Sequence, residues 1–101
     1  MLIYNVTTKI TSAIAEDWLQ WLQEVHIPEI IATGCFTHAN ILRLLEVDDS
    51  EGPTYAIQYM ADSKELYEGY LAIFADALRK KSFDKWGNQF ISFRSVMQIV
   101  Q

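Results

Sequence analysis

The chain has 101 residues, of which half are hydrophobic and 13% aromatic, which is enough for one core and too few for two. Its net charge of -5 and pI near 4.8 repel phosphate backbones and anionic lipid, so we expect neither nucleic acid nor a membrane as a partner. The single cysteine, Cys35, excludes an internal disulfide. The apolar run 2–6 is too short for a signal peptide and lacks a basic flank. We therefore expect one cytoplasmic domain over residues 1–101.

The first third of the chain predicts a strand followed by a helix. Residues 2–10 are rich in β-branched and aromatic side chains, which favour a strand. Pro28 predicts a break near His26 and a new short helical turn, which Gly34 would end with a left-handed backbone. Apolar residues at helical spacing follow Thr11, namely Ile14, Trp18, Trp21, Leu22 and Val25.

The remainder predicts two strands, a second helix and a last strand. Residues 36–47 and 54–61 favour strands, joined by the acidic turn 48–53. Asp62 and Glu65 resemble a capping box that opens the second helix, and a loop is expected at 82–89 before a strand at 90–100. Several charged residues of this helix would face water: Lys64, Glu65, Glu68, Asp76, Arg79 and Lys80.

The resulting order β-α-β-β-α-β predicts a ferredoxin-like α+β fold, with both helices on one face of a four-stranded antiparallel sheet. Successive side chains of a strand point to opposite faces of the sheet, so we expect one set beneath the helices: Tyr4, Val6, Tyr55, Ile57, Tyr59, Phe93 and Met97. The opposite set lies on the open face: Ile3, Asn5, Leu42, Leu44, Ala56, Gln58, Met60, Arg94 and Val96. Because this open face is half apolar, we expect a homodimer that stacks two sheets.

Several segments carry a resemblance: Trp18 and Trp21, His26-Ile27-Pro28-Glu29, Thr33-Gly34-Cys35-Phe36, Tyr55-Ala56-Ile57-Gln58-Tyr59 and Arg94-Ser95-Val96. Together they resemble a bacterial family, domain-of-unknown-function family 4286, of the dimeric α+β barrel superfamily. The resemblance implies sheet-to-sheet dimers. Relatives elsewhere in the superfamily include monooxygenases and haem-degrading enzymes, whose ligands bind between sheet and helices, but no catalytic pattern of theirs is present here residue by residue.

The two histidines allow more than one interpretation. His26 could act as an acid, a base or a ligand contact, or it could hydrogen-bond free carbonyls at a helix end. His38 has no partner at metal-ligand spacing, so we expect neither a metal nor another cofactor. If haem were bound, these would be its only imidazole ligands.

The aromatic residues and one arginine are the other candidates. Aromatic side chains at these spacings form a core, and they also suit a flat pocket. Arg94, expected under the partner sheet, needs either a structural network with Asn5, Gln58 or Glu46, or a bound anion.

We therefore predict a small-molecule-binding protein with a pocket between helices and sheet. A cofactor-independent or haem-dependent monooxygenase is the alternative, and an RNA-binding sheet is disfavoured by the acidic charge. The expected pocket residues are Tyr4, Trp18, Trp21, His26, Tyr59 and Arg94.

Overall fold

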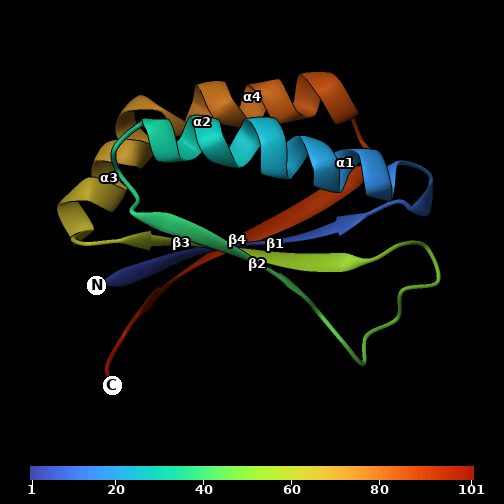
Figure 1. Ribbon diagram of the computed structural model, residues 1–101, viewed down its shortest axis with the longest axis horizontal. Helices are drawn as coiled ribbons and strands as arrows, with labels where there is room; N and C mark the ends of the chain where they lie inside the picture. Colours follow the sequence, from blue (N-terminus) through green and yellow to red (C-terminus); the bar gives the residue numbers. More distant parts are fainter.

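The computed structural model describes all residues, Met1–Gln101, as two layers (Figure 1). One layer is an antiparallel sheet of β1 (Leu2–Ile10), β2 (His38–Arg43), β3 (Thr54–Ala61) and β4 (Phe90–Gln98) in the order β2-β3-β1-β4. All helices cover one face and the other face is open (Figure 1). The predicted ferredoxin-like fold is confirmed, with an open rather than a closed sheet.

The first helical segment is continuous where a break was predicted. A 3₁₀ turn, η1 (Ser12–Ile14), leads into α1 (Ala15–Trp21), the π-helical turn η2 (Leu22–His26) and α2 (Ile27–Ala32). Gly34 follows with the expected left-handed backbone, at φ 80°.

Pro28 explains why the chain widens at η2 instead of breaking. A proline has no N–H to donate, and in a regular α-helix its ring collides with the carbonyl four residues earlier, here that of Glu24. In η2 the amide of Ile27 donates to the carbonyl of Leu22, five residues before it. This wider turn gives the proline ring room, so the helix continues into α2.

The second helical segment is α3 (Lys64–Ile73) followed by α4 (Ala75–Trp86), with a bend at Phe74. Its cap is Ser63, whose hydroxyl accepts a hydrogen bond from Leu66 at 3.2 Å. The prediction that Asp62 caps this helix is therefore wrong by one residue.

The predicted loop at 82–89 is also wrong, because residues 82–86 are the last turn of α4. An exposed ion pair between Lys80 and Asp84, at 2.7 Å, supports this turn. Gly87 ends the helix with φ 62°, which glycine adopts without a steric penalty. The strand predicted at 36–47 is shorter in the structure, where β2 spans only His38–Arg43.

The side-chain faces predicted for β4 are reversed. Tyr4 lies opposite Val96 and Val6 opposite Arg94, and residues directly opposite in an antiparallel pair share a face. Arg94 and Val96 therefore lie on the helix side, while Phe93 and the equally misplaced Met97 lie on the open face. A shift of one residue moves every side chain of a strand to the other face. Both sets in this strand contain apolar residues, so the pattern was ambiguous.

The hydrophobic core lies between the sheet and the helices. Its largest fully buried side chains are those of Ile10, Ile57 and Tyr59, and Cys35 is a buried free thiol beside them. The open face of the sheet is different, because Phe93 there is 66% exposed. None of the helices has the length and apolarity to cross a membrane.

Candidate ligand site

A cavity of about 70 Å³ lies between the helices and the central strands. A water molecule needs at least about 10–15 Å³ by the same measure, so the cavity has room for about five waters. The structure brings all six predicted site residues to its wall: Tyr4, Trp18, Trp21, His26, Tyr59 and Arg94.

The helix places Trp18, Leu22, His26 and Ile30 on the cavity wall at a spacing of four residues. Four residues of a regular α-helix advance by about 400°, so each step rotates the side chain by about 40°. Three such steps would carry the last residue about 120° away from the first. The π turn has more residues per turn and reverses this rotation locally. The turn that accommodates Pro28 thus also keeps His26 on the cavity side.

Trp18 and Trp21 have different environments. The Trp18 ring is buried, 3% exposed, and stacks on Tyr55 with centroids 5.9 Å apart. Trp21 is half-buried and stacks on His26, with centroids 4.6 Å apart and an interplanar angle of 19°. Trp86 meets the Trp21 ring edge-on at 5.8 Å. The aromatic residues therefore form the core and also provide flat cavity walls, so the two interpretations of them are compatible.

His26 is a neutral imidazole at the cavity. Burial lowers its pKa to about 4, the positive charges of Lys81 and Arg94 act in the same direction, and Glu29 partly opposes them. The ring nitrogen Nδ1 is buried and has no hydrogen-bond partner. Because the helix continues past this residue, His26 does not have the helix-end position that the anchoring interpretation requires.

Tyrosine hydroxyls supply neutral polar groups at the same wall. Burial raises the pKa of Tyr70 to about 12, and it raises the pKa of Tyr59 further. The hydroxyl of Tyr4 accepts a hydrogen bond from Nη2 of Arg79 at 3.0 Å. At neutral pH the buried Tyr59 and Tyr70 therefore keep the protons that they could donate to a ligand.

Arg79 is a site residue that the sequence reasoning missed, since it was expected to face water. It lines the cavity from α4, and its Nε is buried without a hydrogen-bond partner. Arginine buries its aliphatic stem while its head reaches a polar site, so helical periodicity alone is a poor guide to it. If the sequence had been predicted as helix over residues 82–86, Arg79 and Ser82 would have fallen on the same helix face, three residues apart. Ser82 also lines the cavity.

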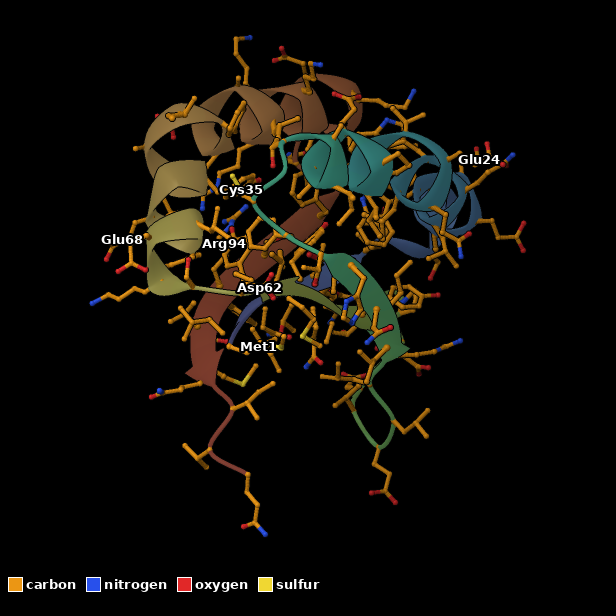
Figure 2. All side chains as sticks on the ribbon, turned by 60° about the vertical axis from the view of Figure 1, so that its left-hand side comes forward. Met1, Glu24, Cys35, Asp62, Glu68 and Arg94 are labelled. Carbon is orange, nitrogen blue, oxygen red and sulfur yellow. The ribbon has the colours of Figure 1, made fainter.

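Arg94 lines the cavity from β4, and not the open face where it was predicted. Figure 2 shows it between the sheet and the helical layer, on the side of α3. The predicted network with Asn5 does not form, because the Asn5 amide donates to Thr7 Oγ1 at 2.9 Å and to Ser95 Oγ at 3.5 Å on the open face. Arg94 forms no ion pair with a carboxylate within 4.0 Å.

The residues present do not suit a metal or haem. No group of three or more His, Cys, Asp and Glu side chains is close enough to hold a metal ion. His38 is exposed and hydrogen-bonds its neighbour Thr37 at 3.1 Å. His26 faces a cavity of about 70 Å³, which is far too small for a four-ring porphyrin.

This architecture is that of ferredoxin-like α+β proteins with a cavity between sheet and helices. The chain belongs to the family described as domain of unknown function (DUF4286), which it matches over residues 1–100. The chain has no match among curated proteins.

Solved structures share the fold at low identity. A dimeric ferredoxin-like protein from an uncultured marine organism is 18% identical, with a TM-score of 0.73 over 100% of this chain and 96% of its own. An ethyl tert-butyl ether d (ethd) family protein from Bacillus halodurans is 11% identical, with a TM-score of 0.65 over 98% and 100%. SnoaB, a cofactor-independent oxygenase from Streptomyces nogalater, is 10% identical, with a TM-score of 0.66 over 99% and 94%. At these identities the likeness shows the fold alone.

Proposed function

We propose that this protein binds a small aromatic molecule in the cavity between its helices and its sheet. The observation that carries this proposal is a flat aromatic wall beside buried polar atoms without partners. Trp21 and His26 present stacked rings, and the unpartnered atoms are Nδ1 of His26 and Nε of Arg79. An unsatisfied buried polar group costs about 1–3 kcal/mol, so a ligand that bonds to these atoms would gain that energy. Ligand sites are typically apolar with a few such polar groups.

The cavity size limits the ligand to about one ring. A volume of about 70 Å³ is about half of the roughly 150 Å³ of an engineered cavity that binds benzene, so the cavity encloses at most one ring and excludes a polycyclic system. We infer a bacterial, cytoplasmic protein that binds a monocyclic compound.

The proposed assembly is a homodimer that stacks two open sheet faces. Ile91 and Phe93 on that face are 61% and 66% exposed, which is unfavourable for a free monomer. A solved structure of similar fold is itself described as dimeric, which supports the proposal. The interface residues differ from those first expected, because Arg94 and Val96 point to the helix side and Phe93 takes their place.

A cavity-filling variant tests ligand binding. Ser82 lines the cavity from α4, whereas Ala77 on the same helix is exposed, so Ser82→Met fills the cavity and Ala77→Met is the matched control. Tryptophan fluorescence would follow titration with single-ring aromatic compounds, including benzamide, benzoate, phenol and aniline. We expect saturable binding that Ser82→Met weakens at least about tenfold, since overpacking displaces a ligand of this size.

Two results would contradict this proposal. One is the absence of saturable binding for every compound in the panel. The other is equal affinity in Ser82→Met and Ala77→Met, which would place the bound compound outside the cavity.

A second candidate function is a cofactor-independent monooxygenase, favoured by the neutral imidazole of His26. A general base must be unprotonated at the working pH and must reach the substrate. Burial keeps the imidazole of His26 unprotonated at neutral pH, and its ring lines the cavity, so it could accept a hydrogen bond from the hydroxyl of a bound phenol, although a pKa near 4 makes it a weak base. A cofactor-independent oxygenase has the same fold.

A further inference from the structure

Two of the three basic side chains that form no ion pair with a carboxylate line the cavity. Five of the eight lysines and arginines form ion pairs with Asp or Glu. Lys85 lies over the Trp86 ring, with its Nζ 5.1 Å from the centroid. The remaining two are Arg79 and Arg94, and both line the cavity. No Asp or Glu lines it, although the chain has 13 acidic residues.

Arg79 has a donor free for a ligand. One Nη2 hydrogen bond goes to Tyr4, and Nε is buried without a partner. Asp76, one turn earlier on α4, acts on Arg79 electrostatically but is exposed and forms no ion pair with it. The guanidinium group offers five N–H donors in one plane, a geometry that matches the two oxygens of a carboxylate.

Arg94 reaches the same region from the opposite layer. It lies beside Val6 in the sheet and is exposed at the cavity wall, on the side of α3 in Figure 2. The charges of Arg79 and Arg94 both act on the Tyr70 hydroxyl and lower its pKa, against the larger opposite effect of burial. Both arginines and Tyr70 line the same cavity, with Arg79 coming from α4 and Arg94 from β4, so two positive charges act on one small polar site.

We propose that the ligand is an aromatic carboxylic acid, with its carboxylate between Arg79 and Arg94 and its ring toward Trp21. This inference rests on the proposed function and names the class of ligand. Without an anion, the two positive charges repel each other, and Nε of Arg79 remains a buried donor without an acceptor. A carboxylate removes both costs, whereas a neutral amide of the same shape can accept a hydrogen bond through its carbonyl oxygen but leaves the repulsion between the two charges.

Matched acid and amide pairs test the proposal on the full chain at pH 7. The probes are benzoate against benzamide and phenylacetate against phenylacetamide, with acetate as an anion that has no ring. Calorimetry would measure each affinity. We expect each aromatic acid to bind at least about tenfold more tightly than its amide, as charge-assisted hydrogen bonds require, and acetate to bind far more weakly.

Two variants locate the effect. Arg94→Gln should reduce the preference for acid over amide to less than about threefold while changing the amide affinity little. The control is Arg43→Gln, since Arg43 is an exposed arginine of the same sheet that pairs with Asp49 at 3.4 Å, outside the cavity. Arg79→Lys keeps the charge, loses the planar fork and should weaken acid binding in part.

The outcomes separate the two proposals. Equal affinities for acids and amides in the unmodified protein would overturn the inference and leave an aromatic site standing. Acetate binding as tightly as benzoate would also overturn it. If no aromatic compound binds, the proposed function fails and the inference fails with it. An unchanged acid preference in Arg94→Gln would overturn the assignment of the carboxylate position.

Discussion

Mild acid should destabilise this protein through His26. The pKa of the imidazole is about 4 in the fold, against 6.5 for an ordinary histidine. Between these values the unfolded chain binds a proton that the native protein does not bind. The free energy of unfolding therefore falls as the pH falls, and the stabilisation is complete only above about pH 6.5. Burial is the main cause, Lys81 and Arg94 act in the same direction, and Glu29 opposes them.

The size of the effect follows from the difference in pKa. Each pH unit of difference is worth about 1.36 kcal/mol, so a shift from 6.5 to about 4 gives about 3 kcal/mol in total. About 2 kcal/mol of this appears between pH 7 and pH 5. For a domain of this size, urea reduces stability by about 1–3 kcal/mol per molar, so the midpoint should fall by about 0.7–2 M.

Urea unfolding at pH 7 and pH 5, followed by tryptophan fluorescence at one protein concentration, measures this loss. His26→Gln removes the titrating group and should make the loss about 2 kcal/mol smaller than in the unmodified protein. His38→Gln is the control, because His38 is exposed on β2. If all three proteins lose the same stability, His26 is not buried as a neutral imidazole and this reasoning is refuted.

Two further predictions concern assembly and activity. Phe93→Asp, on the open face, should convert the dimer to monomer or aggregate. Ile73→Asp, at a 72% exposed position on α3, should leave the protein a dimer. If the unmodified protein sediments as a monomer at micromolar concentration, the dimer prediction is wrong. If the protein is an oxygenase, it should consume dissolved oxygen in the presence of a phenolic substrate faster than buffer alone does. His26→Gln should lower that rate at least about hundredfold. If an oxygen electrode records no consumption above that of buffer, the activity is excluded for the phenols used.

Local chemistry in the sequence was sufficient for the order of elements and for two strands. The predicted bounds of β1 and β3 agree with the structure, since alternating side chains between turn residues identify a half-buried strand. Gly34 has the left-handed backbone expected after a helix. The family resemblance is also confirmed over residues 1–100.

Helix details were less accessible because they depend on competition between neighbours. Pro28 predicts a disturbance in any sequence, but a break and a π turn both satisfy its steric demand. The choice depends on packing of the whole segment against the sheet, which keeps Trp18, Leu22 and His26 on one side. Likewise Ser63 and Asp62 are both suitable caps, and the geometry of the chain entering α3 selected Ser63.

The sequence by itself determined the fold class and the residue types of the cavity, because both depend on short-range patterns of hydrophobicity and aromatic content. Only the tertiary structure decided which side chains of β4 lie on the helix side of the sheet. Their direction depends on the hydrogen-bonded register between β4 and β1, which pairs residues about 90 positions apart, such as Tyr4 and Val96. That register places Arg94 at the cavity, and Arg79 on α4 lines the same cavity. The positive charge of the site therefore arises from long-range pairing, which no local pattern encodes.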